Sequence, residues 1–167
     1  MRGFTLVELI VVVGILSVMA AGAVLVLNPI GQFQKANDAK RKADLTQIQK
    51  AVETYYQDNG KYPISSISNP LYRITTPTQS GVVTVDWGSS WQPYMNVLPK
   101  DSGTSRNYVY YSTGQSYYLY ASLERGASDP QVCNGGSACS SLATYAIPST
   151  ACGGICNYGV TSPNVSP

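Results

Sequence analysis

The sequence predicts an α+β protein. In it a long N-terminal helix, with an apolar membrane half and an amphipathic half, packs against a small antiparallel β-sheet head that ends in a disulfide-stapled C-terminal loop region. Three observations support this fold class. An uncharged apolar run extends from Leu9 to Leu27, a helical pattern follows over 31–58, and apolar and polar residues alternate over 117–124 before four cysteines.

The N-terminal segment carries a single acidic residue, Glu8, directly before 19 uncharged residues from Leu9 to Leu27. A helix of that length spans about 28 Å, close to the thickness of a bilayer's hydrocarbon core. A secretory signal peptide has a shorter apolar core, whereas this run continues past the small residues at 20–23. We therefore expect a membrane-spanning helix, in which Glu8 requires a cationic partner.

The residues around Glu8 carry a specific motif. Gly3 precedes Phe4, and positions 5–10 read Thr-Leu-Val-Glu-Leu-Ile. This pattern resembles the N-terminal signal of type IV pilins and of the pseudopilins of type II secretion, with an unusually short leader. The resemblance implies cleavage by a prepilin peptidase between Gly3 and Phe4, followed by N-methylation of Phe4. An ordinary single-pass anchor with a similar beginning is the alternative.

Cleavage before Phe4 would create a cationic amine one helical turn from Glu8. The two charges can neutralise each other within one chain or between neighbouring subunits of a helix bundle. Breaking such a pair in an apolar environment costs about 3–5 kcal/mol, because the remaining charge has no partner. We expect Phe4 and Glu8 to control assembly.

The chain changes character at Asn28-Pro29, where we expect a kink or a local break. The helix should end at the turn signal Asp58-Asn59-Gly60. The expected organisation is a leader at 1–3, a transmembrane and filament-core helix at 4–28, an amphipathic helix at 29–57 and a β-rich head at 58–167. The basic run at 40–42 is expected to be a solvated helix face, which we favour over contact with lipid headgroups.

The head is expected to contain short strands at 72–76 and 82–86 and a hairpin formed by 108–112 and 117–124. One face of the hairpin should cover the helix. The alternation predicts a half-buried strand. Its other face carries Tyr118 and Tyr120, which suit subunit contacts or an exposed adhesive surface, although cross-strand packing is the favoured interpretation. Trp87 and Trp91 are expected to anchor a loop onto the core.

The four cysteines Cys133, Cys139, Cys152 and Cys156 all lie near the C-terminus. An even number of cysteines in an exported head predicts two disulfides, with three possible connectivities. A zinc site is disfavoured because the spacing lacks the paired Cys-x-x-Cys pattern of zinc ribbons.

Composition argues against catalysis and against nucleic acid as a partner. The chain has no histidine, 12% charged residues and a net charge of +2, and it carries neither a nucleophile motif nor a phosphate-binding loop. We predict no enzyme activity and no cofactor. Resemblance to major pseudopilins leaves calcium possible, with Glu124, Asp129 and Asn134 as candidate ligands, although a solvated loop is the favoured interpretation.

The sequence therefore predicts a structural subunit of a type IV pilus, because the cysteine-bearing tail is absent from most major pseudopilins. The expected partners are further copies of the chain in a helical filament, the prepilin peptidase, an inner-membrane assembly platform and membrane lipid before assembly. The subunit should lie in the cytoplasmic membrane and then in an extracellular pilus. The alternatives are a major pseudopilin of type II secretion, or a membrane-anchored protein that binds DNA or a surface ligand without polymerising.

Overall fold

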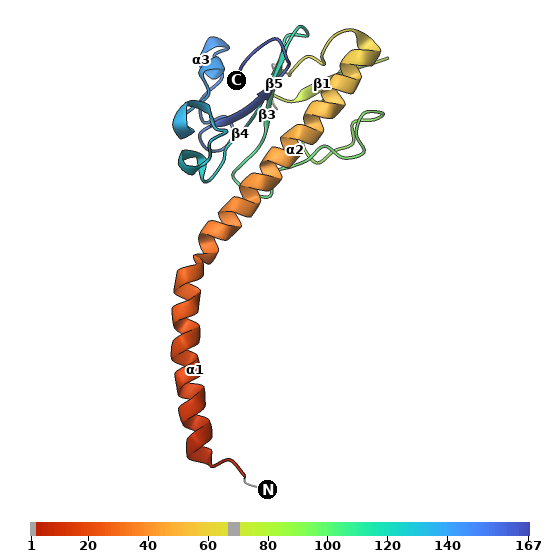
Figure 1. Ribbon diagram of the computed structural model, residues 1–167. Coiled ribbons are helices and arrows are strands. Elements are labelled where there is room, and N and C mark those ends of the chain that lie inside the picture. The colour runs from red at the N-terminus through yellow and green to blue at the C-terminus, as the bar shows by residue number, and fades with distance from the viewer. Residues whose placement is uncertain (1–2, 67–70) are drawn as a thin grey trace. The chain divides into compact units, whose positions relative to one another are not determined.

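The computed structural model describes residues 3–66 and 71–167, with the backbone alone at 24–27. The chain divides into two compact units, Met1–Ala36 and Asn37–Pro167, which we call the N-terminal unit and the head and describe separately. Figure 1 shows that the N-terminal unit is helical, whereas the head combines helix and strands. The α+β fold class is confirmed.

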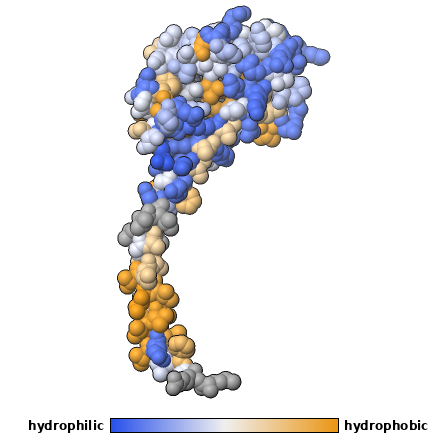
Figure 2. Space-filling view, viewed as in Figure 1, coloured by the Kyte–Doolittle hydropathy of each residue, from blue (hydrophilic) through white to orange (hydrophobic). Residues whose placement is uncertain are grey.

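Helix α1 (Leu6–Leu27) contains one ionisable residue, Glu8, in its first turn. The described side chains from Leu6 to Ala23 are all exposed, and Figure 2 shows hydrophobic residues along this helix. Among the described residues, the segment Leu6–Ala23 alone is long and apolar enough to cross a membrane; a signal sequence near an N-terminus would satisfy the same criteria. Such a continuous apolar surface is stable only when lipid or other helices cover it.

The expected break at Asn28-Pro29 is confirmed. Asn28 adopts a left-handed conformation with φ 40°, which ends α1, and helix α2 (Pro29–Asn59) begins at the next residue. The Asn28 side chain accepts a hydrogen bond from the Gly31 amide at 3.2 Å and so caps α2. Proline suits the first position of a helix because its missing N–H would have no partner there.

Helix α2 ends at the predicted turn. Gly60 has a positive φ of 69°, and its amide donates to the Tyr56 carbonyl at 2.8 Å. The Asn59 side chain donates to the Tyr55 carbonyl at 2.9 Å. These bonds satisfy carbonyl groups that the helix end would otherwise leave unpaired.

The head contains two antiparallel sheets. Strands β1 (Ile74–Thr78) and β2 (Gly81–Val85) form a hairpin, and the other sheet has the order β3-β4-β5, with β3 at Val109–Ser112, β4 at Tyr117–Ala121 and β5 at Tyr158–Thr161. The predicted hairpin between β3 and β4 is present, with Val109 opposite Tyr120. Strand β5, which pairs Val160 with Leu119, was not predicted.

The main core lies between α2 and one face of the three-stranded sheet. Leu45, Ile48 and Val52 of α2 are fully buried, as is Leu119 of β4. Trp87 and Trp91 join this core and anchor the loop as predicted. Their indole N–H groups donate to the Tyr108 carbonyl and the Thr76 hydroxyl respectively, each at 2.8 Å.

The opposite face of the sheet is not exposed, which corrects the expectation of a half-buried β4. Tyr118 is 4% exposed and Tyr120 fully buried, beneath a second core that contains Leu142 and Ile147 of the C-terminal segment. Figure 1 shows this segment, including helix α3 (Ser140–Thr144), beside the sheet. The two tyrosines are therefore packing residues and do not present a surface for subunit contacts.

We expect Ile48→Ala to lower the free energy of unfolding of the head by about 2–5 kcal/mol, because it leaves a cavity beneath α2. Urea unfolding of the full chain in detergent micelles, followed by the fluorescence of Trp87 and Trp91, measures this change. Thr46→Ala on the exposed face of α2 is the control and should change stability by less than about 0.5 kcal/mol. Equal effects of both substitutions would contradict the assigned core.

Candidate processing and assembly site

Helix α1 begins with a reciprocal capping arrangement between Thr5 and Glu8. The Glu8 amide donates to the Thr5 hydroxyl oxygen at 3.2 Å, while the Glu8 carboxylate accepts from the Thr5 amide at 2.9 Å and from the Thr5 hydroxyl at 2.8 Å. Each side chain thereby satisfies an amide that the first helical turn leaves unpaired. The geometry fixes the Glu8 carboxylate at the helix N-terminus.

The adjoining residues are accessible. An added Cβ at Gly3 would meet no atom within 4 Å, and the Phe4 side chain is 86% exposed. In the uncleaved chain the Phe4 nitrogen is an amide, so the expected charge pair between a Phe4 amine and Glu8 belongs to a processed chain. The roles of Gly3, Phe4 and Glu8 in processing and assembly therefore remain predictions.

The head contains a second cluster of charges around the buried side chain of Arg41, which is 3% exposed. Its guanidinium donates to Asp101 at 2.7 Å, to Glu124 at 2.9 Å and to Asp38 at 3.0 Å. We call these four residues the Arg41 cluster. Because a buried charge is costly without partners, this cluster holds α2 against two loops of the head.

Three further hydrogen bonds extend the Arg41 cluster. Asp38 also accepts the backbone amides of Glu124 at 2.8 Å and Arg125 at 2.9 Å. One turn along α2, the Asp44 carboxylate accepts the Tyr108 hydroxyl at 2.7 Å. Burial together with Asp44 raises the pKa of Tyr108 well above its usual value, so this hydroxyl remains a donor at neutral pH.

The expectation that residues 40–42 form a solvated face is wrong for two of the three. Arg41 is buried in its cluster, and Lys42 forms an ion pair with Asp129 and lies 5.4 Å from the centre of the Tyr158 ring. Lys40 is exposed. Sequence reasoning missed Arg41 because its partners Asp101 and Glu124 are 60 and 83 residues away.

Each of the three candidate calcium ligands has another hydrogen-bond partner in the structure. Glu124 accepts from Arg41, Asp129 accepts from Lys42, and the Asn134 amide donates to the Ala138 carbonyl at 2.8 Å. Within 3–66 and 71–167, no group of three or more histidine, cysteine, aspartate or glutamate residues is placed to hold a metal ion.

The four cysteines form disulfides between sequence neighbours, Cys133 with Cys139 and Cys152 with Cys156. The Cys139 amide donates to the Cys156 carbonyl at 3.0 Å, which joins the two bridged loops. The bridges thus stabilise the segment that covers the outer face of β4.

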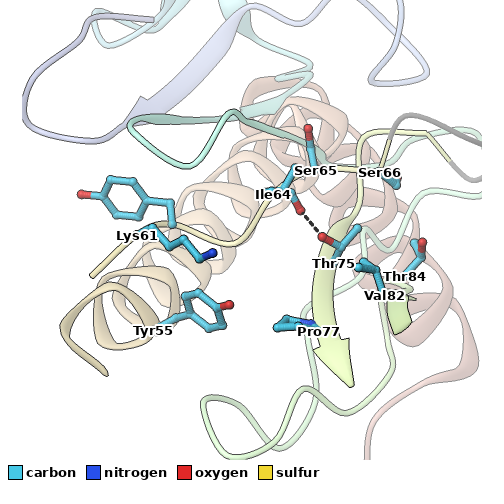
Figure 3. A pocket seen from close by; sticks show the side chains of 10 residues that line it. Tyr55, Lys61, Ile64, Ser65, Ser66, Thr75, Pro77, Val82 and Thr84 are labelled. Atoms are coloured by element: carbon cyan, nitrogen blue, oxygen red, sulfur yellow. Dashed lines mark hydrogen bonds between the residues drawn. The ribbon is translucent and has the colours of Figure 1, made fainter. Parts of the chain in front are cut away.

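A pocket of 430 Å³ opens between the end of α2 and the β1–β2 hairpin (Figure 3). Its titratable lining residues are Tyr55, Lys61 and Tyr62. Burial and the nearby Glu53 raise the pKa of Tyr62 to about 12. Sequence reasoning did not single out this pocket, and its chemistry suits contact with apolar groups better than proton transfer at neutral pH.

Comparisons with known proteins identify the family. A family model described as "Type II secretion system (T2SS), protein G" matches residues 28–137, and one described as "Prokaryotic N-terminal methylation motif" matches residues 1–24. The chain belongs to the type II secretion system protein G family. No solved structure matches it.

Individual members of the protein G family share 30–40% sequence identity with this chain over the matched residues. "Type II secretion system core protein G" of Klebsiella pneumoniae is 30% identical over 128 residues, which cover 77% of this chain and 80% of that protein. The protein of Vibrio cholerae is 33% identical over 67% of this chain and 71% of its own length. The protein of Pectobacterium carotovorum is 40% identical over 46% of this chain and 47% of its own length, so the match spans about half of that relative.

Membership of the protein G family corrects the function predicted from the sequence. The pilus interpretation relied on the cysteine-bearing tail, whereas the family match extends from residue 28 to residue 137 and so includes Cys133. The alternative of a type II secretion pseudopilin agrees better with the comparisons. The family assignment also confirms that the chain is not an enzyme.

The Arg41 cluster predicts acid sensitivity of the head. Burial by itself would raise the pKa of Asp101, but hydrogen bonds from Arg41 and the Gly103 amide outweigh it and hold that pKa below its usual value. A carboxyl group with a lowered folded-state pKa contributes its full stability above the unfolded-state value of about 3.9 and loses it as the pH falls through the folded-state value. Asp101→Asn should remove this part of the acid dependence.

Urea unfolding of the full chain in micelles between pH 7 and pH 2 tests this prediction. At pH 7, Asp101→Asn should lower the free energy of unfolding by about 3 kcal/mol, because Arg41 loses a charged partner, and the difference from wild type should shrink below pH 4. Asp58→Asn on the exposed end of α2 is the control. A pH-independent difference for Asp101→Asn would contradict the electrostatic explanation.

The disulfide pairing predicts that thiol labelling of the denatured, unreduced protein modifies none of the four cysteines. Peptide mapping without reduction should recover the Cys133–Cys139 and Cys152–Cys156 links. Free thiols, or a link between the first and second pairs, would contradict the pairing.

Proposed function

We propose that this chain is the major pseudopilin of a type II secretion system and polymerises through its N-terminal helix into a periplasmic pseudopilus. The observation that carries the proposal is the joint match to protein G over residues 28–137 and to the N-terminal methylation motif over residues 1–24. The curated relatives of similar sequence bear the name of core protein G of that system.

The proposed anchoring uses the apolar segment Leu6–Ala23 in the cytoplasmic membrane before assembly. A prepilin peptidase would cut between Gly3 and Phe4 and methylate the new amine. The exposed Gly3 and Phe4 support this step, because a protease must reach the backbone it cuts. On this proposal the leader is residues 1–3, the filament-core helix 4–28, the amphipathic helix 29–57 and the head 58–167.

The proposed assembly step depends on the charge of Glu8. Within residues 3–66 and 71–167 its carboxylate receives hydrogen bonds from Thr5 and none from a cationic side chain. A released Phe4 amine on a neighbouring subunit would supply the missing positive charge in an apolar helix bundle. The apolar, exposed surface of α1 supplies the remaining contacts of that bundle.

We expect Glu8→Gln to be cleaved normally but to lower incorporation into the polymer by more than about a hundredfold, which corresponds to the loss of a charge pair in an apolar environment. Glu8→Asp should be intermediate, because its shorter side chain retains the charge. Ser17→Ala in the same helix, where the serine hydroxyl donates to the Val13 carbonyl at 2.7 Å, is the matched control. A deletion strain complemented with each variant provides the assay.

Three measurements on these strains separate the outcomes. Intact mass should show the loss of residues 1–3 and a methylated Phe4 in all variants, chemical crosslinking should show an oligomer ladder, and culture fluid should contain the secreted proteins. Normal crosslinking and secretion with Glu8→Gln alone would exclude the charge pair as the driving interaction. A processed wild-type chain that never crosslinks would favour the non-polymerising anchored protein and contradict the proposed function.

A further inference from the structure

Four basic residues adjoin the Arg41 cluster, three as sequence neighbours of its members and one through the loop that follows Asp101. They are Lys40, Lys100, Arg106 and Arg125, and we call them the basic patch. Within residues 3–66 and 71–167, none of the four forms an ion pair. Lys40 and Lys100 are exposed and the two arginines are partly exposed.

Contacts made by their buried neighbours bring the backbones of these basic residues close together. Lys40 and Lys100 directly precede Arg41 and Asp101, whose side chains are joined at 2.7 Å. The amide of Arg125 donates to Asp38 at 2.9 Å.

Arg106 completes the patch from the loop that follows Asp101. Its side chain packs beside Gly103, whose amide donates to Asp101 at 2.8 Å, and its guanidinium donates to the Ser122 carbonyl at 3.0 Å. These contacts bring the four backbones close to the Arg41 cluster and to Asn37, the first residue of the head, whose side-chain amide donates to Glu124 at 3.5 Å.

The carboxylates of this region point inward. Asp38 and Asp101 are buried and Glu124 is partly buried, and all three accept hydrogen bonds from Arg41. The outer layer is consequently cationic. In the described part of the head, the exposed carboxylates are those of Asp58 and Asp86, which lie on separate elements. The partly buried carboxylates of Glu53, Glu124 and Asp129 already accept hydrogen bonds from Tyr117, Arg41 and Lys42. These contacts favour lipid headgroups over a second copy of the head as the anionic partner.

The covalent link to the membrane segment restricts how far the basic patch can move from the bilayer. Asn37 follows Ala23, the last residue of the candidate span, by a segment about 21 Å long when helical and no more than about 48 Å when extended. An anionic leaflet attracts each nearby lysine or arginine by about 1 kcal/mol within a Debye length of about 8 Å.

We propose that, before assembly, the basic patch docks the head on the anionic phospholipid headgroups of the membrane that holds α1. This inference rests on the proposed function in so far as α1 must span that membrane. Docking holds the unassembled subunit in one orientation at the bilayer surface. The patch leaves the lipid when the subunit enters the polymer.

The test uses the full chain reconstituted at about one copy per vesicle. One set of vesicles is pure phosphatidylcholine, and the other contains phosphatidylglycerol. Both carry a dansyl-labelled headgroup lipid as the energy acceptor. The donors Trp87 and Trp91 both lie in the head and are the only two tryptophans of the chain, so energy transfer reports the distance of the head from the headgroups.

Transfer should be greater in vesicles with phosphatidylglycerol, and 1 M salt should abolish the difference, because the Debye length then falls to about 3 Å. The double variant Lys40→Gln, Lys100→Gln should lower the ratio of docked to free heads about 25-fold, at about fivefold per lysine. The control is Lys50→Gln, Lys61→Gln. It removes the same charge from exposed residues. Lys50 lies about 15 Å beyond Lys40 along α2, so this variant should retain most of the difference in energy transfer between the two kinds of vesicle.

Equal transfer in both kinds of vesicle, or equal losses in the two double variants, would overturn the proposal. Unchanged transfer combined with reduced crosslinking of Lys40→Gln, Lys100→Gln in cells would assign the patch to contact between copies, which also overturns it. Failure of the proposed function is distinguishable, because a chain that never polymerises in cells can still show lipid-dependent transfer in vesicles.

Discussion

The arrangement of the head depends on the burial of one positive charge, that of Arg41. Its partners come from α2 itself, from the loop that leads toward β3 and from the segment that follows β4. Because an unpaired charge in this position costs several kcal/mol, α2 can pack on the sheet only in the register that brings Asp101 and Glu124 to the guanidinium. The apolar contacts of Leu45 and Ile48 supply most of the driving force for folding, but such contacts tolerate sliding and rotation. The Arg41 cluster determines the register in which α2 packs on the sheet.

The N-terminal unit and the head pair their carboxylates in different ways. In the N-terminal unit, a single carboxylate sits at the start of an exposed apolar helix and is satisfied by its own first turn. In the head, carboxylates are gathered around one buried cation and their backbone neighbours. Among the described residues, the first arrangement pairs Glu8 with no cation, whereas the second pairs its carboxylates with Arg41. On the proposed function Glu8 serves association, while the Arg41 cluster serves internal positioning.

Local signals in the sequence were sufficient for the features that depend on local chemistry. The apolar run of α1, the break at Asn28, the turn at Asn59-Gly60 and the β3–β4 hairpin each follow from neighbouring residues. Features that depend on distant partners could not be predicted. Arg41 lies in a basic run, and no local pattern indicates the carboxylates far along the chain that bind it. Strand β5 has four residues and follows a glycine-rich loop. The burial of Tyr118 and Tyr120 depends on the fold of the C-terminal segment. The motif around Glu8 identified the family, whereas the cysteines misdirected the choice between pilus and pseudopilus.

The pairing of the cysteines affects the order in which the C-terminal segment oxidises and folds. Each bridge closes a loop of only a few residues, since the partners are six and four positions apart. Chain segments of this size meet within about 10–100 ns, far faster than oxidation of thiols, which takes seconds or longer. Correct partners are therefore the nearest available thiols from the moment the end of the chain is exposed to oxidant, whether or not the sheet has formed. The disulfides can therefore form before the C-terminal segment packs on β4. The segment then packs with its cysteines already paired, and exchange between disulfide partners is avoided.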